Sequence, residues 1–270
     1  MARDAATARL EPGPLVTLTH GAMSVDVAPQ AGGRIAQIRV DGVEQLAGFS
    51  DDNDATIGWG SYPMVPWAGR VRRGEFAFEG ASHRLPANLG VHAIHGAGFA
   101  LPWQVDSQST HHVGLSLALP EDERWPFGGI ARQRIELEAR GLRMTLSATA
   151  GERAMPAELG WHPWFLKPDR IEFAPTAWYP RDEDGMATRP LAPPPPGPWD
   201  DCFMNDAPVM LHRGAQRVTL TSDCAHWVVF DMPERTTCVE PQSGPPDAFN
   251  LEPRVLAPGQ TLERWFRLAW

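Results

Sequence analysis

Two histidines stand in surroundings suited to acid–base or ligand-binding chemistry. His95 is followed directly by Gly96, which lets the backbone turn sharply and leaves the imidazole accessible. His162 is flanked by Trp161 and, after one proline, by Trp164. An apolar wall disfavours the charged imidazole and brings its titration into the range that acid–base work uses. Taken alone, each histidine is more often a packed structural residue, so a catalytic role needs further support.

Three other positions offer charged groups for a site. Glu240 ends an apolar strand and enters a loop rich in proline and glycine, where rigid β scaffolds place functional side chains. By itself, a glutamate in this position is more often a solvated carboxylate at a strand end. Asp200 and Asp201 form an adjacent acidic pair, which is usually a turn. Arg70 follows an apolar, aromatic stretch, and a partly buried arginine generally has an anionic or multi-acceptor partner.

Several catalytic classes lack their sequence motifs. The chain has no GxSxG elbow, no phosphate-cradling GxxxxGK[ST] and no HExxH. His111 and His112 have no third ligand at useful spacing, so we expect no metal site. The 11 tryptophans combine a flat apolar face with a donor, which suits stacking on sugar rings. Tryptophan is just as often a core residue, so the tryptophans by themselves do not distinguish a carbohydrate site from a packed core.

The elements that position these residues are predicted to be strands. The 25 glycines and 27 prolines punctuate many short apolar segments along the whole chain. Alternation of apolar and polar residues is clearest in 114–119 and 142–147, and Gly141 predicts a hairpin. Similar runs occupy residues 34–40, 75–78, 134–138, 217–221, 227–230 and 262–268. No helical period persists over three turns, so the fold class is all-β.

Length and composition favour one globular unit. The 270 residues contain 43% apolar and 21% charged residues, and an all-β domain commonly reaches this length. We therefore expect residues 1–270 to form a single domain, with about 1–14 as a loose N-terminal extension. The proline-rich stretch 190–198 reads as a stiff surface loop within it.

Charge and cysteine content narrow the expected partners and compartment. The formal net charge is −9 and no basic block is present, which argues against nucleic-acid binding. No run approaches the roughly 20 apolar residues of a membrane helix, and no secretory signal is visible. The three cysteines are odd in number and too widely spaced for a metal-binding motif such as CxxC, which fits a protein of the reducing cytoplasm.

The order of seven segments is more informative than any one of them. Together they resemble the aldose 1-epimerase (galactose mutarotase) family: residues 34–42, 66–76, 85–88, 93–96, 160–165, 200–203, and 240–242 followed by 246–250. The resemblance runs from about residue 30 to the C-terminus. It implies a large antiparallel β-sandwich whose concave face holds a sugar, with no metal and no organic cofactor.

The resemblance also assigns roles to single residues. Glu240 matches the general base and His162 the general acid of sugar ring opening. The expected sugar-binding residues are Arg70, His95, Asp200 or Asp201, Trp164 and Gln242. Gly69 stands where the family usually has asparagine, and Trp164 replaces its usual tyrosine. These departures leave the acid–base pair intact and leave open which sugar is used.

The predicted activity is therefore interconversion of the α and β anomers of a free aldose, by a monomer or weak homodimer. Three alternatives remain open. A sugar 6-phosphate mutarotase would use Arg72 and Arg73 for charge, and a non-catalytic carbohydrate-binding protein would need only the aromatic face. A glycoside hydrolase normally needs two facing carboxylates, which Glu240 and an aspartate would have to supply.

Overall fold

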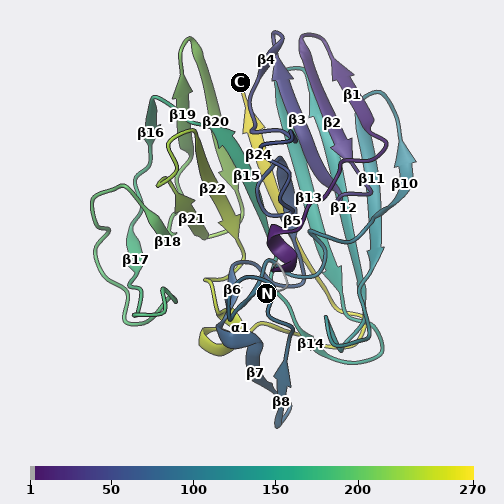
Figure 1. Cartoon of the computed structure of the whole chain (residues 1–270), viewed down its shortest axis with the longest axis vertical. Coiled ribbons are helices and arrows are strands. Elements are labelled where there is room, and N and C mark those ends of the chain that lie inside the picture. The colour runs from purple at the N-terminus through teal and green to yellow at the C-terminus, as the bar shows by residue number, and fades with distance from the viewer. Residues whose placement is uncertain (1–3) are drawn as a thin grey trace.

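Two large antiparallel sheets form the body of the chain (Figure 1). The computed structural model describes residues 4–270. The strand order in the first sheet is β1-β2-β3-β5-β15-β22-β21-β18-β17, with β4 paired to β3. Its strands are β1 (Val16–His20), β2 (Met23–Ala28), β3 (Arg34–Val40), β4 (Val43–Glu44), β5 (Ser61–Met64), β15 (Gly160–Leu166), β17 (Ala177–Tyr179), β18 (Asp200–Met204), β21 (His226–Phe230) and β22 (Thr236–Gln242).

The second sheet has the order β10-β11-β12-β13-β24-β20-β19-β16. Its strands are β10 (Gln104–Gln108), β11 (His112–Ala118), β12 (Ile130–Glu138), β13 (Gly141–Thr149), β16 (Arg170–Glu172), β19 (Val209–Arg213), β20 (Gln216–Ser222) and β24 (Thr261–Ala269). The segments 134–138, 142–147, 217–221 and 262–268, which alternate in sequence, fall in this sheet, as does 114–119 up to its last residue but one. Gly141 begins β13 immediately after the turn from β12, as predicted.

Alternation along the strands decides which side chains fill the core. Trp161 of β15 faces the second sheet, and its ring centroid lies 5.9 Å from that of Phe266 on β24. Trp227 of β21 lies 6.2 Å from the same phenylalanine ring. Because successive residues of a strand point to opposite faces, His162 projects from the other face of the first sheet. The all-β sandwich expected from the sequence is confirmed.

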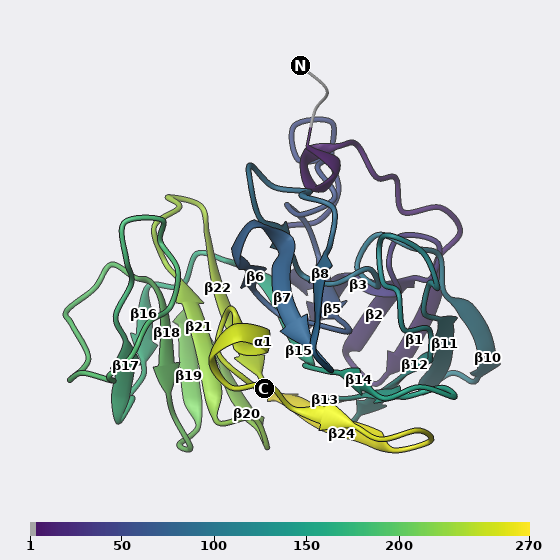
Figure 2. The same ribbon diagram turned by 90° about the horizontal axis from the view of Figure 1, so that it is seen from below.

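Short elements surround that other face. They are the pairs β6 (Arg70–Val71) with β9 (Ala93–Ile94), β7 (Glu75–Phe78) with β8 (Ala81–Arg84) and β14 (Met155–Pro156) with β23 (Val255–Leu256), together with η1 (Ala5–Thr7), η2 (Arg72–Gly74) and α1 (Ala248–Leu251). The elements β6, β7, β8 and α1 gather at one end of the molecule, below the sheets in Figure 1 and toward the viewer in Figure 2.

The described part of the N-terminal segment packs against this region. Ala6 is fully buried, its N–H donates to the carbonyl of Asn88, and its carbonyl accepts from Ile57. Residues 1–3 of the expected loose extension lie outside the described residues. The proline-rich stretch 190–198 joins β17 to β18, which pair with each other in one sheet. No helix within residues 4–270 is long and apolar enough to cross a membrane.

Candidate active site

Cross-strand register brings His162 and Glu240 together from β15 and β22. Gly160 of β15 pairs with Gln242 of β22, and Trp164 pairs with Cys238. His162 and Glu240 each lie midway between these paired residues on their strands, so they lie opposite each other. Both side chains are buried. The His162 Nε2 atom lies 3.2 Å from Glu240 Oε1. The two predicted acid–base groups are therefore in direct contact.

Burial controls the protonation of this pair. It raises the pKa of Glu240 well above the usual carboxyl value, and the charge of Asp200 raises it further. Burial lowers the pKa of His162 to about 3, because the imidazolium loses its hydration. Both shifts favour the uncharged form of each partner. A single proton shared between carboxyl and imidazole satisfies this preference.

Two aromatic rings pack against the His162 imidazole. The Tyr62 ring, which comes from the neighbouring strand β5, stacks on it with centroids 4.8 Å apart and planes inclined by 26°. The Trp164 ring lies 5.1 Å away on the same strand as His162. Trp164 is itself anchored, because its Nε1 donates to the carbonyl of Ile57 at 2.7 Å. These contacts fix the plane in which the imidazole can exchange a proton.

A buried arginine supports this stack from below. The guanidinium of Arg34 lies 4.9 Å from the Tyr62 ring centroid and 4.3 Å from that of Trp59. Its nitrogens donate to the backbone carbonyls of Ala31, Thr56, Trp59 and Phe99 at 2.7–3.0 Å. Arg34 is thus a structural cation that ties three loops to the sheet beneath the site.

His95 reaches the same place from the end of β9. Its φ is 63°, a left-handed conformation that is rare for a side chain of this size. The next residue, Gly96, packs so closely that a Cβ there would lie 2.1 Å from the carbonyl oxygen of Val65. His95 is consequently held edge-on to His162, with ring centroids 4.9 Å apart. Burial, with His162 and Arg70 adding to it, keeps the pKa of His95 well below its usual value.

These groups line one cavity of about 270 Å³. Seven of the eight predicted site residues contribute to its wall, together with apolar residues that close its sides. The predicted ones are Arg70, His95, His162, Trp164, Asp200, Glu240 and Gln242, and the apolar ones include Ile57, Leu89, Val228 and Phe230. The volume is below the range of roughly 300–1,000 Å³ common for drug-sized ligands. A single monosaccharide is the size of ligand it suits.

The structure separates Asp200 from Asp201, which the sequence leaves equivalent. Asp200 lines the cavity, and its Oδ2 accepts from Arg181 Nη1 at 2.9 Å. Asp201, the next residue of β18, points to the other side of the strand, where its Oδ1 accepts from Trp178 Nε1 at 3.0 Å. Asp201 is outside the cavity, so Asp200 is the candidate ligand-binding aspartate.

The local structure explains why position 69 is glycine, where the family that the sequence resembles usually has asparagine. Its φ is 64°, and a Cβ at this position would come within 3.0–3.1 Å of the Pro246 ring. Any larger side chain would push the 243–246 loop outward. The neighbouring backbone is tied down as well, because the Asp247 N–H donates to the Arg70 carbonyl at 2.7 Å. Gly69 therefore lets two loops close over one wall of the cavity.

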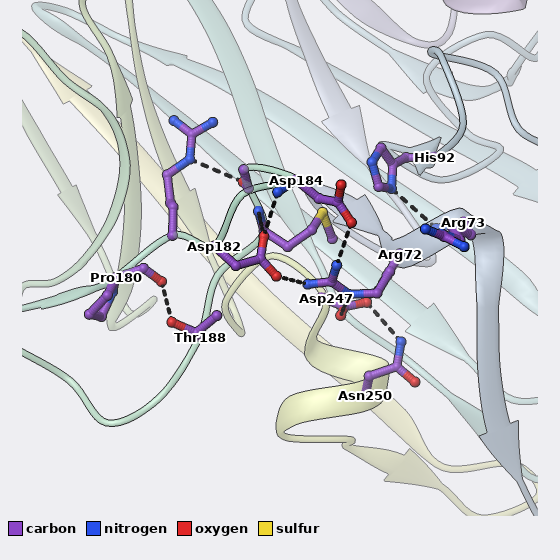
Figure 3. A network of polar contacts seen from close by, with 12 residues as sticks. Arg72, Arg73, His92, Pro180, Asp182, Asp184, Thr188, Asp247 and Asn250 are labelled. Carbon is purple, nitrogen blue, oxygen red and sulfur yellow. Dashed lines mark hydrogen bonds and ion pairs between the residues drawn. The ribbon is translucent and has the colours of Figure 1, made fainter.

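Arg72 and Arg73 lie outside the cavity wall. Figure 3 shows the Arg72 guanidinium among carboxylates: it pairs with Asp182, and with Asp184 at 3.1 Å. Its backbone N–H donates to Asp247 Oδ1 at 2.9 Å. Arg73 is exposed and lines a separate, larger groove. Neither arginine lines the cavity, so neither is placed where the sugar phosphate alternative needs its charge.

Sequence reasoning missed several residues that shape the site. Tyr62 stacks on His162, and Arg34 lies over the Tyr62 ring. Arg181 donates to Asp200. Each of these residues is separated from its partner by many residues in the sequence. Cys238, which precedes Glu240 by two residues and so shares its face of β22, does not line the cavity.

The chain is similar in sequence to known proteins. The sequence profile of the aldose 1-epimerase family matches residues 14–269. The uncharacterized protein YphB of Escherichia coli K12 is 32% identical over 182 residues, covering 64% of this chain and 60% of that protein. The uncharacterized protein YihR of the same organism is 30% identical over 105 residues, covering 37% and 34%. The matched regions thus span less than two thirds of either relative.

Solved structures share the architecture over nearly the whole chain. A galactose mutarotase-like protein from Clostridium acetobutylicum superposes with a TM-score of 0.84 at 16% identity, covering 94% of each chain. The galactose 1-epimerase from Lactobacillus acidophilus NCFM gives 0.81 at 18% identity, covering 97% of this chain and 96% of that one. Identities this low establish the fold alone. The family profile goes further, and because it covers nearly every residue from the first strand to the last, the chain belongs to the aldose 1-epimerase family.

Proposed function

We propose that the chain is an isomerase that interconverts the α and β anomers of a free aldose. The observation that carries the proposal is the buried contact between His162 Nε2 and Glu240 Oε1, 3.2 Å long, at the wall of a monosaccharide-sized cavity. Mutarotation needs one group that takes a proton and one that gives a proton at the same carbon. A carboxyl and an imidazole side by side meet this requirement.

The proposed reaction starts with the sugar bound against this pair. The single proton of the pair first passes from Glu240 to His162 across their 3.2 Å contact. The Glu240 carboxylate then removes the proton of the C1 hydroxyl while His162 delivers its proton to the ring oxygen, and the C1–O5 bond breaks. Both oxygens are attached to C1, so two adjacent groups can reach them together. The aldehyde then rotates about the C1–C2 bond, and reclosure on its other face reverses both proton transfers. No proton is gained or lost in the cycle.

The remaining polar wall would orient the sugar. Arg70 and His95 are candidates for hydrogen bonds to ring or hydroxyl oxygens, and Asp200 for a hydroxyl donor. Within residues 4–270, His95 Nδ1 and Gln242 Oε1 are buried polar atoms without a hydrogen-bond partner. Such atoms are costly unless a ligand or water satisfies them. Their place on the cavity wall supports a polyhydroxylated ligand.

The activity can be tested by anomer exchange in NMR saturation transfer, on a panel of free aldoses, 6-deoxy sugars and sugar 6-phosphates. Enhanced exchange with a free aldose supports the proposal, and a strict requirement for a 6-phosphate would replace it with the phosphate alternative. Sugar binding without exchange on the whole panel would favour the carbohydrate-binding alternative. Release of the aryl group from aryl glycosides would indicate a hydrolase.

Arg70→Ala is expected to weaken substrate binding more than turnover. A hydrogen bond from a charged donor contributes about 1.5–3 kcal/mol, so KM should rise roughly 10- to 100-fold while kcat changes less. Arg73→Ala is the matched control, because Arg73 is the exposed arginine outside the cavity. Steady-state polarimetry of both variants measures the difference, and an unchanged KM in Arg70→Ala would remove that residue from the sugar site.

Asp200→Asn is expected to move the acidic limb of kcat/KM to lower pH. Activity is lost as the pH falls through the pKa of Glu240, because a protonated carboxyl cannot accept the C1 hydroxyl proton. The Asp200 charge raises that pKa, so removing the charge lowers it. The control is Asp201→Asn, since that carboxylate faces Trp178 instead of the cavity. A limb that stays in place in Asp200→Asn, or moves to higher pH, contradicts the assignment.

A further inference from the structure

Three metal-binding side chains converge next to the cavity. One ligand atom each from His162, Cys238 and Glu240 lies within 4.8 Å of the other two. All three residues are buried, and Cys238 is fully so. The proposed sugar chemistry uses His162 and Glu240 but gives Cys238 no task. A thiol held beside a carboxyl and an imidazole is the donor set of a transition-metal site.

The strand register builds this cluster. Cys238 and Glu240 are two residues apart on β22, so their side chains share one face. His162 lies on the adjacent strand β15, between Gly160, which pairs with Gln242, and Trp164, which pairs with Cys238. Trp164 on β15 and Phe230 on β21 flank Cys238 as its register partners. The three donors thus come from the rigid centre of the sheet. They need no loop movement to meet.

His162, Cys238 and Glu240 can supply three of the four ligands of a tetrahedral zinc ion. Nitrogen and oxygen ligands at about 2.0–2.1 Å from zinc lie about 3.3 Å from each other, close to the observed 3.2 Å between His162 and Glu240. Sulfur at about 2.3 Å from zinc needs to lie about 3.6 Å from those atoms. The Cys238 sulfur lies within 4.8 Å of both atoms, so it must approach them by at most about 1.2 Å.

We propose that His162, Cys238 and Glu240 form an inhibitory Zn²⁺ site, with the fourth coordination position facing the sugar cavity. The thiol and carboxyl bind as anions, so their two charges neutralise the dication in a buried place, and each releases its proton to solvent if it holds one. A sulfur ligand selects zinc over Mg²⁺ and Ca²⁺, which prefer oxygen. Zinc occupies the atoms that the proton transfers need, so it competes with the sugar.

The structure favours a reversible ion over a permanent one. With Nε2 on the metal, the proton of His162 must sit on Nδ1, and within residues 4–270 that atom has no hydrogen-bond partner. Histidines that hold a resident metal almost always donate this second N–H to an acceptor. The missing acceptor weakens the site and suits an ion that comes and goes with its free concentration.

The test measures metal binding directly and does not depend on the sugar chemistry. The protein, kept reduced with a non-thiol reductant, is titrated with Zn²⁺ against a chromophoric chelator. We expect one reversibly bound ion per chain, at least about 100-fold weaker binding in Cys238→Ala, and no change in Cys224→Ala, which removes another buried cysteine. Mg²⁺ should not compete.

Cobalt identifies the ligand. Co²⁺ bound to the wild type should give a thiolate-to-cobalt charge-transfer band that is present in Cys224→Ala and absent in Cys238→Ala. The surface pair His20 and His111, with rings 4.7 Å apart, cannot produce this band, because all three cysteines are buried elsewhere. The wild-type spectrum also decides the matter if Cys238→Ala fails to fold. Absence of the band, or equal zinc affinity in Cys238→Ala, overturns the proposal.

For an active enzyme, zinc should raise the apparent KM for sugar, and a chelator should reverse the effect. Cys238→Ala should keep its basal exchange rate and lose this sensitivity. A wild-type chain that binds zinc through Cys238 but exchanges no sugar would count against the proposed function and leave the metal site standing. Zinc-insensitive exchange by a wild type that does bind zinc would overturn the inhibitory role.

Discussion

Glu240→Gln is expected to lower anomer exchange by at least about 100-fold on any sugar that the wild type accepts. The amide has nearly the shape of the carboxyl and can still hydrogen-bond to His162, which lies 3.2 Å from it in the native pair. It cannot accept the proton of the C1 hydroxyl. Saturation-transfer NMR at saturating sugar measures the loss, which should fall on kcat more than on KM.

Glu158→Gln is the matched control for this substitution. Glu158 is also a buried glutamate with a pKa raised by burial, but its Oε2 accepts from the backbone of Ala68 and it does not line the cavity. Its variant should retain exchange within a few-fold of the wild type. If Glu240→Gln keeps comparable activity with an unchanged circular dichroism spectrum, Glu240 is not the base.

His162→Ala is expected to abolish exchange to a similar extent and to cost stability. Removing the imidazole deletes the proton donor and leaves the Glu240 carboxyl buried without its partner. An unsatisfied buried polar group costs about 1–3 kcal/mol, so the free energy of unfolding in urea should fall by at least that amount. The folded fraction at the assay temperature must therefore be measured alongside the rate.

Added imidazole separates the catalytic loss from the structural one. The truncation leaves a ring-sized space beside Tyr62 and Trp164, whose rings lie 4.8 and 5.1 Å from the native imidazole, on the wall of the cavity. Free imidazole should restore part of the exchange in His162→Ala and none in Glu240→Gln. Full activity in the alanine variant without added imidazole would exclude His162 as the acid.

The local sequence pattern was enough to predict the fold class and most of the long strands. Leu142–Ser147 alternates because β13 lies with one face on the core, and the hairpin at Gly141 follows from the same register. The short elements around the site were harder to predict. The pair β6 with β9 has only two residues per strand, too few for any periodicity to be seen.

Within a single strand, the sequence also places side chains on a face. Every second residue of a strand points to the same face. On β22 this rule puts Cys238, Glu240 and Gln242 on one face. On β15 it puts His162 and Trp164 on one face. Adjacent Asp200 and Asp201 had to point apart for the same reason. Which of the two faces the cavity depends on where β18 sits in the sheet, and that required the structure.

The sequence by itself determined an all-β chain with the ordered segments of its family, and it identified seven of the residues that line the cavity. Tertiary structure alone decided that His162 touches Glu240, that Tyr62 stacks on the imidazole and that Arg72 is bound to aspartates. The physical reason is that these contacts join strands and loops distant in the chain. Their pairing is set by the packing of whole sheets, and local residue preferences carry no record of it.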